Sequence, residues 1–285
     1  MTLPIDTTID FDSGSWTLVK AFDAGGSCTV FRAISIDGEE AAIKVHRPIR
    51  KGHKIPVRVR NEMNFSIERH PYIIAPKEST IEEFKGTRVV CLLLEFADHR
   101  ELSEYITPEN PTKKGLKKRL NVVKSMASAV EHLHNNDWIH GDISDRNFLL
   151  DKDKNEALLI DFESSVPISG NKEGMVWARR EFLAPEVDLN GIAALSKKSD
   201  VWSLGLLLVQ WLKPSIWQEL KKKQGWQEIF NYRKENNLSN VTGTIIEQES
   251  PEGAEHVWEW LKKSLSIDSR DRPEVSELVR CLEND

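Results

Sequence analysis

The chain has 285 residues, a formal net charge of −6 and 39% hydrophobic residues, a composition that excludes an intrinsically disordered chain and gives no reason to expect a nucleic-acid partner. Its three cysteines, Cys28, Cys91 and Cys281, are too few and too widely spaced for a disulfide framework, so we expect an intracellular location, cytoplasmic or nuclear. The N-terminus has no apolar signal segment, and the longest apolar run, 204–209, is too short to cross a membrane.

Three antiparallel β-strands are predicted between residues 16 and 45, where β-forming residues alternate with polar ones. The turn at 23–26 is a candidate phosphate-covering loop, because its glycines Gly25 and Gly26 would let backbone N–H groups approach phosphate oxygens. Taken alone, this turn is equally well interpreted as an ordinary hairpin turn.

Lys44 lies within the apolar strand segment 42–45, where a lysine is costly to bury unless its charge is used. Two interpretations are open for this residue considered alone. Its ammonium group binds the phosphates of a nucleotide, or it reaches water from an edge strand.

The segment that follows, 46–60, is basic, and we interpret it as a solvated face, with a dock for phosphate or an acidic partner as the alternative. A helix is predicted over 57–69, ended by a His-Pro pair. Residues 88–98 indicate a buried strand that runs into a linker. Apolar residues at helical spacing in 120–134 and beyond indicate a mainly helical second half, so the fold class is α+β.

Two short apolar runs, 148–150 and 157–160, are joined by a charged turn, and this pattern predicts a β-hairpin. Polar residues lie just outside it, with Asp142 and Asn147 before the first strand and Asp161 after the second. Because a hairpin brings its outer ends together, we expect these three side chains to converge on one point.

Three oxygen-bearing side chains at one point suit a hard divalent cation and a substrate proton. The spacing of Asp142, Asn147 and Asp161 is the arrangement that protein kinases use for phosphoryl transfer. In this interpretation Asp142 orients or deprotonates the acceptor hydroxyl group, while Asn147 and Asp161 hold Mg²⁺ against the nucleotide phosphates.

These motifs give the chain a resemblance to the eukaryotic protein kinase catalytic domain over nearly its whole length. His-Gly-Asp at 140–142 stands where that family has His-Arg-Asp, and Asp-Phe-Glu at 161–163 where it has Asp-Phe-Gly. Ala-Pro-Glu at 184–186, the helix start at 200–205 and Arg272 also match the family pattern. The catalytic loop is similar to that of fungal kinase-like proteins.

The resemblance implies one bilobal protein kinase domain over residues 1–285. A small β-rich N-lobe would span about 12–95, a hinge about 95–98, and a larger helical C-lobe about 99–285. It further implies that Asp200 caps the backbone of the catalytic loop, and that Glu186 and Arg272 form a buried ion pair.

The resemblance also implies an ATP site, in which Lys44 contacts the α- and β-phosphates and pairs with Glu62. Leu94 would be the gatekeeper, and the backbones of Glu95 and Ala97 would bind adenine. The complete nucleotide-binding set is Gly25, Gly26, Val30, Ala42, Lys44, Glu62, Leu94, Glu95, Ala97 and Leu149. The catalytic set is Lys44, Asp142, Asn147 and Asp161, of which Asn147 and Asp161 are the metal ligands.

Several residues depart from the family pattern. Gly141 replaces the arginine that receives a phosphorylated activation loop, and Glu163 replaces a glycine beside the metal. Ser144 and Arg179 stand where serine/threonine kinases have a lysine and a threonine in contact. We hypothesise that Arg146 or Arg179 supplies the missing cation near the transferred phosphoryl group; the alternative is that both arginines pair with nearby carboxylates.

The sequence thus predicts an ATP- and Mg²⁺-dependent protein kinase, with Mn²⁺ as an alternative metal, that acts on serine or threonine in preference to tyrosine. A protein substrate or protein partner is expected, without nucleic acid or a membrane segment; no pattern indicates an oligomeric state. The main alternative is a pseudokinase that acts as a binding scaffold or allosteric partner. A small-molecule kinase is the third, but aminoglycoside and choline phosphotransferases lack the 184–186, 200–205 and Arg272 motifs.

Overall fold

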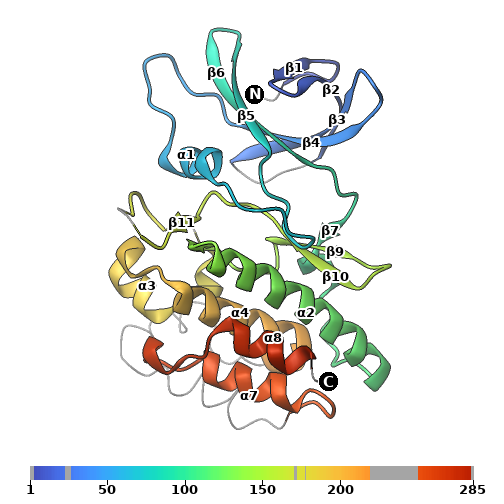
Figure 1. Cartoon of the computed structure of the whole chain (residues 1–285), viewed down its shortest axis with the longest axis vertical. Helices are drawn as coiled ribbons and strands as arrows, with labels where there is room; N and C mark the ends of the chain where they lie inside the picture. The colour runs from blue at the N-terminus through green and yellow to red at the C-terminus, as the bar shows by residue number, and fades with distance from the viewer. Residues whose placement is uncertain (1–2, 23–26, 170–171, 177, 219–249, 284–285) are drawn as a thin grey trace. The chain divides into compact units, whose positions relative to one another are not determined.

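The computed structural model describes residues 3–22, 27–169, 172–176, 178–218 and 250–283. It has the β-rich N-terminal region and the helical C-terminal region expected from the sequence (Figure 1). The chain forms two compact units. Unit 1 consists of Met1–Arg69, Ile74–Asp98 and Asp161–Glu163, and unit 2 consists of His70–Ile73, His99–Ile160 and Ser164–Asp285.

A six-stranded antiparallel sheet, in the order β1-β2-β3-β4-β6-β5, forms most of unit 1. Its strands are β1 (Thr8–Phe11), β2 (Gly14–Phe22), β3 (Cys28–Ser35), β4 (Glu40–His46), β5 (Glu78–Phe84) and β6 (Thr87–Glu95). Strands β2, β3 and β4 confirm the three predicted near the N-terminus. Strands β1, which pairs with β2, and β5, which pairs with β6, were not predicted from the sequence.

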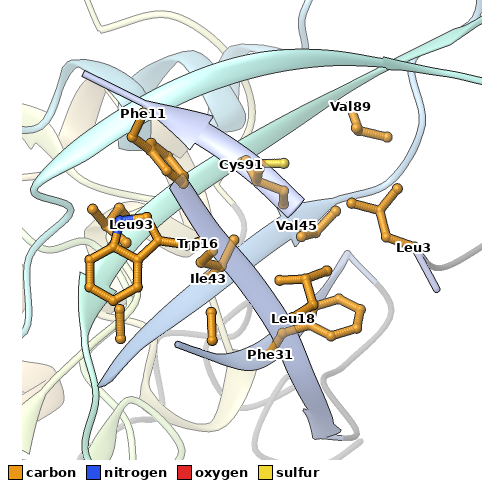
Figure 2. Close-up of a cluster of buried hydrophobic side chains, with 13 residues drawn as sticks. Leu3, Phe11, Trp16, Leu18, Phe31, Ile43, Val45, Val89, Cys91 and Leu93 are labelled. Atoms are coloured by element: carbon orange, nitrogen blue, oxygen red, sulfur yellow. The ribbon is translucent and has the colours of Figure 1, made fainter. Parts of the chain in front are cut away.

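One face of this sheet carries the hydrophobic core of unit 1 (Figure 2). The core side chains recur at every second residue of β2, β3, β4 and β6, which is the period of a strand with one buried face. They are Leu3, Ile9, Phe11, Trp16, Leu18, Phe31, Ala33, Ala41, Ile43, Val45, Val89, Cys91 and Leu93. Ala42, Lys44 and His46 alternate with the core residues of β4, so their side chains point to the opposite face.

Helix α1 (Val57–Asn64) is shorter than predicted from the sequence. The prediction over 57–69 is wrong beyond Asn64, because Phe65 has an extended backbone with φ −66° and ψ 121°. The ring of Phe65 stacks on that of Phe162, with 4.0 Å between centroids and 12° between planes. A tertiary contact thus ends the helix where local pattern would continue it.

Unit 2 contains the predicted hairpin. Its strands, β9 (Phe148–Asp151) and β10 (Glu156–Leu159), pair antiparallel, and the short β7 (Arg100–Glu101) extends the sheet on the β9 side. A second small sheet pairs β8 (Trp138–Ile139) with β11 (Val166–Pro167). The catalytic stretch therefore begins at one short strand and runs into the hairpin.

The other elements that the structure describes in unit 2 are helices (Figure 1). The α-helices are α2 (Lys113–Asn135), α3 (Pro185–Asn190), α4 (Lys197–Leu212), α7 (Glu255–Ser264) and α8 (Val275–Glu283). The 3₁₀ helices are η1 (Leu102–Tyr105), η2 (Arg180–Phe182), η3 (Gly191–Ala194) and η4 (Ser269–Asp271). Within the described ranges, no helix is both long enough and apolar enough to cross a membrane.

Helix α4 is the buried central helix that the sequence predicted. Ser196 caps its N-terminus by accepting a hydrogen bond from the Ser199 N–H, and Ser199 Oγ accepts one from the Ser196 N–H. A Cβ at Gly205 would lie 2.0 Å from Ser264 Oγ of α7, so only glycine allows these two helices to pack this closely.

The expected ion pair between Glu186 and Arg272 is present in unit 2. Two guanidinium nitrogens of Arg272 donate to the Glu186 carboxylate, at 2.6 and 2.8 Å. The same guanidinium donates to the carbonyl oxygens of Lys198, Ser266 and Ile267, and the Arg272 side chain is fully buried. Arg272 therefore ties the start of α3 to the start of α4.

Replacing Arg272 by alanine should lower the free energy of unfolding by about 3–5 kcal/mol, because the Glu186 carboxylate and three carbonyl groups lose their shared donor. Urea denaturation followed by tryptophan fluorescence would measure this change. Arg270→Ala, in the same turn but on an exposed side chain, is the control and should leave the midpoint unchanged. Equal midpoints for the two variants would contradict a structural role for Arg272.

His70 connects the segment 70–73, which lies between α1 and β5 in the chain, to helix α2. Its Nε2 lies 3.2 Å from Ser128 Oγ, and its Nδ1 accepts a hydrogen bond from the Tyr72 N–H at 3.3 Å. The ring stacks on that of His132 with 4.5 Å between centroids. Burial, together with the charge of His132, lowers the pKa of His70 from 6.5 to about 4.

A lowered pKa means that the folded state binds fewer protons than the unfolded state, so the free energy of unfolding should fall as pH drops from 6.5 towards 4. The His70→Gln variant has no group at position 70 that binds a proton in this pH range. Unfolding midpoints measured between pH 7.5 and 4.5 should therefore fall more steeply for the wild type than for His70→Gln. Parallel profiles would show that His70 does not contribute to acid sensitivity.

Candidate functional site

Lys44 of β4 lies among three carboxylates of unit 1. Its ammonium group donates to Glu62 Oε1 of α1 at 2.8 Å and to Asp161 Oδ1 at 3.0 Å, and it lies 3.2 Å from Glu163 Oε1. The expected pair with Glu62 is therefore present. Burial alone would lower the pKa of Lys44, but these carboxylates outweigh it and raise the pKa well above its ordinary value. Lys44 carries its charge throughout the physiological pH range.

Glu163, which stands where the family has glycine, is a second centre of contacts. Ser27 Oγ donates to Glu163 Oε1 at 3.3 Å, and Arg58 Nε lies 3.5 Å from Glu163 Oε2. His46 lies between two acids, with Nδ1 3.7 Å from Glu163 Oε1 and Nε2 3.2 Å from Glu62 Oε2. Glu163 thus joins the start of β3, the end of β4 and helix α1.

We call this group the ion cluster: Lys44, His46, Arg58, Glu62, Asp161 and Glu163. Sequence reasoning missed His46 and Arg58, which it assigned to a solvated face. That interpretation is wrong for His46, whose residue is only 2% exposed. Two periodicities could have identified both residues. His46 is two residues from Lys44 on one strand, and Arg58 is four residues from Glu62 on one helix.

Asp161 differs from the other acids of the ion cluster in its exposure. Its side chain is 38% exposed, against 1% for Glu62 and 10% for Glu163. It has a left-handed backbone with φ +66°, and its Oδ1 accepts the Glu163 N–H at 3.3 Å. A non-glycine residue held in this region is often functional. Among the three carboxylates around Lys44, Asp161 is the one that an incoming cation can reach.

Four of the residues predicted to bind nucleotide share one face of the sheet. Val30 is the cross-strand partner of Lys44, and Ala42 is the partner of Leu94. Because partners in an antiparallel pair project to the same side, these four lie together opposite the core of unit 1. Glu95 ends β6 and is exposed, and Ala97 follows in the linker. Gly25 and Gly26 lie outside the described residues.

The catalytic loop of unit 2 holds Asp142 and Asn147 together. Asn147 Nδ2 donates to Asp142 Oδ2 at 2.8 Å and to the Asp142 carbonyl oxygen at 2.7 Å. The other carboxylate oxygen, Asp142 Oδ1, accepts the backbone N–H of Arg179 at 3.0 Å. Leu149, also predicted to bind nucleotide, follows two residues later on β9.

The backbone of this loop is held by Asp200 at the start of α4, as expected. Its carboxylate accepts the N–H of His140 at 2.8 Å and that of Gly141 at 3.0 Å, and it lies 3.0 Å from the His134 ring. Gly141 has φ +77°, and a Cβ there would lie 2.7 Å from Ser164 O. The arginine that the family has at this position would clash with that carbonyl group.

The structure brings Lys44, Glu62 and Asp161 together in unit 1, and Asp142 and Asn147 together in unit 2. The convergence of all three of Asp142, Asn147 and Asp161 stays a prediction. Within unit 2, the Ile160 N–H donates to the Asn147 carbonyl oxygen at 3.0 Å, so the second hairpin strand ends beside Asn147.

Each unit offers oxygen atoms of the kind that suit the magnesium ion that the family implies. In unit 2, Asn147 uses Nδ2 toward Asp142, so its amide oxygen is left for a cation. In unit 1, Asp161 offers an accessible carboxylate. Amide and carboxylate oxygens are ligands that Mg²⁺ prefers. His46, Glu62 and Glu163 also have ligand atoms within 4.8 Å of one another, but the Lys44 ammonium already supplies a cation to both glutamates.

Lys44→Met should lower the free energy of unfolding by about 3–5 kcal/mol, because Glu62 and Glu163 would remain buried without their shared cation. Combined with Glu62→Gln in a double-mutant cycle, it should show a coupling energy of about 1–3 kcal/mol. Chemical denaturation would measure both quantities. Lys54→Met, on an exposed residue of the basic segment 46–60, serves as control. Additive effects would contradict a coupled pair.

Comparison with known proteins connects this geometry to a family. The model of the protein kinase domain matches residues 16–281. The chain is 29% identical over 211 residues to the serine/threonine-protein kinase PrkC of Bacillus subtilis, an alignment that covers 72% of this chain and 31% of that protein. It is 24% identical over 285 residues to the interferon-induced, double-stranded RNA-activated protein kinase of Rattus norvegicus, covering 93% and 51%.

A third relative is a probable serine/threonine-protein kinase, a KIN1 homolog of Enterocytozoon bieneusi, which is 28% identical over 198 residues, covering 68% of this chain and 32% of that protein. The chain therefore spans between about a third and a half of the length of these three relatives. The family match covers most of the chain and includes both groups of site residues, so the chain belongs to the protein kinase domain family.

Proposed function

We propose that the chain is an ATP-dependent protein kinase that transfers the γ-phosphate of ATP to a protein hydroxyl group, on serine or threonine in preference to tyrosine. The observation that carries the proposal is the geometry of Asp142, whose two carboxylate oxygens are each held by a different donor. The preference for serine or threonine is supported by the names of relatives such as PrkC.

In the proposed reaction, the acceptor oxygen forms a bond to the γ-phosphorus as the bond from that phosphorus to the ADP oxygen breaks. Asp142 accepts the proton of the acceptor hydroxyl group, or orients that group so that its oxygen faces the phosphorus. ADP and the phosphorylated protein are the products. Asp142 suits this role because its side chain is held on both oxygens yet is not fully buried.

The remaining site residues bind and orient the nucleotide. Lys44 would contact the α- and β-phosphates, since its permanently charged ammonium group is already held in place by Glu62. Asn147 and Asp161 would hold Mg²⁺, or Mn²⁺ as the alternative, which neutralises phosphate charge when bound. Val30, Ala42, Leu94 and Leu149 would surround adenine, with the backbones of Glu95 and Ala97 as its hydrogen-bonding partners and the loop containing Gly25 and Gly26 over the phosphates.

A pseudokinase scaffold is the second candidate function, and one observation favours it. Glu163 places a third carboxylate 3.2 Å from the Lys44 ammonium, where nucleotide phosphates would have to compete for the same cation. A small-molecule kinase is less well supported. Arg272 anchors the segment at 184–186 through Glu186, and a platform that binds a protein acceptor would require such an anchor. A protein substrate and a cytoplasmic or nuclear location complete the proposal.

Incubation with γ-labelled ATP, with Mg²⁺ and separately with Mn²⁺, should transfer label to the protein itself or to a mixed protein substrate. Asp142→Asn should lower the rate by about 10²- to 10⁴-fold, the usual contribution of a positioned proton acceptor. The identity of the phosphorylated residue would test the preference for serine or threonine.

Asp142→Asn should keep the unfolding midpoint of the wild type, which separates lost chemistry from lost folding. Absence of transfer by folded wild-type protein with either metal would overturn the proposal in favour of the pseudokinase. Transfer to a soluble hydroxyl compound, with none to protein, would favour the small-molecule kinase instead.

A further inference from the structure

Asp145 has a buried carboxylate with a partner on each oxygen. Its Oδ1 accepts a hydrogen bond from the Arg179 guanidinium, and its Oδ2 accepts one from Gln210 Nε2 of α4 at 2.9 Å. The Asp145 carbonyl oxygen accepts the Ser103 N–H at 2.9 Å. With the residue only 5% exposed and tied to α4 and η1, Asp145 is a fixed point within the catalytic loop.

Arg179 connects this fixed point to the proposed catalytic residue. Its side chain binds Asp145, while its backbone N–H donates to Asp142 Oδ1 at 3.0 Å. The guanidinium also donates to Glu181 Oε1 at 2.9 Å and lies over the Phe182 ring, 5.5 Å from its centroid. A single residue of the segment before η2 therefore contacts Asp142 through its main chain and Asp145 through its side chain.

These contacts decide between the two interpretations of Arg179 that the sequence left open. A guanidinium that binds two carboxylates, Asp145 and Glu181, has its charge compensated within unit 2. It therefore matches the interpretation in which the arginine pairs with nearby carboxylates. Its contribution to the reaction has to come through the position of its backbone.

We propose that Arg179 and Asp145 form a positioning pair for Asp142. The ion pair holds the main chain at Arg179 where its N–H restrains Asp142 Oδ1, and Asn147 restrains Oδ2. This inference rests on the proposed kinase function, because it concerns the residue assigned as proton acceptor. It adds two residues that would act through the position of Asp142, and explains how the segment before η2 reaches that residue.

The physical reason is the rotation of the Asp142 carboxylate. A carboxylate held on one oxygen can turn about its last side-chain torsion, whereas one held on both oxygens keeps a single plane. A misplacement of about 1 Å at a reacting group can cost 10²-fold in rate. A change of the Arg179 side chain leaves its backbone N–H in the chain, but it removes the ion pair with Asp145 that fixes the position of that N–H. Losing either partner of the pair should therefore have the same consequence as losing the other.

Steady-state kinetics of Arg179→Ala, Asp145→Asn and the double variant would test the pair. Each single variant should lower kcat by about 10- to 100-fold, the scale of a misplaced reacting group, while KM for ATP changes less than about 3-fold. The double variant should be no slower than the worse single variant. Arg179→Lys, which keeps the charge, should recover part of kcat.

Glu181→Gln is the matched control, because it removes the other carboxylate partner of the same guanidinium and leaves Asp145 in place. Its kcat should stay near the wild-type value. A loss in Glu181→Gln equal to that in Asp145→Asn, or kcat unchanged in both Arg179→Ala and Asp145→Asn, would overturn the proposal.

Hydrogen exchange of the peptide that contains Arg179 tests the pair without any activity. The Arg179 amide should exchange faster in Asp145→Asn and in Asp142→Ala than in the wild type, and at the wild-type rate in Glu181→Gln. If the wild type transfers no phosphate, the kinase function fails, yet this measurement still decides the pair. Unchanged exchange in Asp145→Asn would refute it.

Discussion

The part of the site that is proposed to bind the nucleotide depends on one constraint, the burial of the Lys44 ammonium group. A buried cation is tolerated only when anions surround it, and here Glu62, Asp161 and Glu163 all lie within 3.2 Å. Glu62 comes from helix α1, and Asp161 and Glu163 come from a segment more than a hundred residues after Lys44. The charge of Lys44 thereby holds three parts of unit 1 together, namely β4, helix α1 and the segment 161–163.

Glu163 adds contacts to this arrangement that the glycine of the family pattern could not make. A glycine at that position has no side chain that could contact Ser27 or Arg58, whereas the glutamate contacts both of them and Lys44. The ion cluster is therefore assembled by residues of unit 1 alone. Gly141 fits the same picture in unit 2, since the close approach of Ser164 O leaves no space for the arginine that would receive a phosphorylated segment. Each departure from the family pattern is therefore accommodated by contacts within its own unit.

Much of this architecture could be predicted because its signals are local or belong to a motif. The strands β2 to β4 follow from alternation, and the hairpin of β9 and β10 follows from two apolar runs joined by a charged turn. The Arg272 ion pair follows from the family pattern. The end of α1 could not be predicted, since it depends on the stacking of Phe65 against Phe162. The partner of Arg179 was missed for a similar reason, because no periodicity shows which side chain of an irregular loop turns inward.

The two acidic residues central to the proposed chemistry are restrained by different physical means. Asp161 is held by a buried cation and keeps an exposed side chain, so its binding of a metal depends on the charge balance of the ion cluster. Asp142 is held by neutral N–H donors, whose positions depend on packing and on the ion pair of Arg179 with Asp145. Changes in the ion cluster should therefore act first on metal and nucleotide, whereas changes before η2 should act on the acceptor step. Under the proposed function, a change that abolished one step need not abolish the other, so a variant that no longer transferred phosphate could still bind a nucleotide.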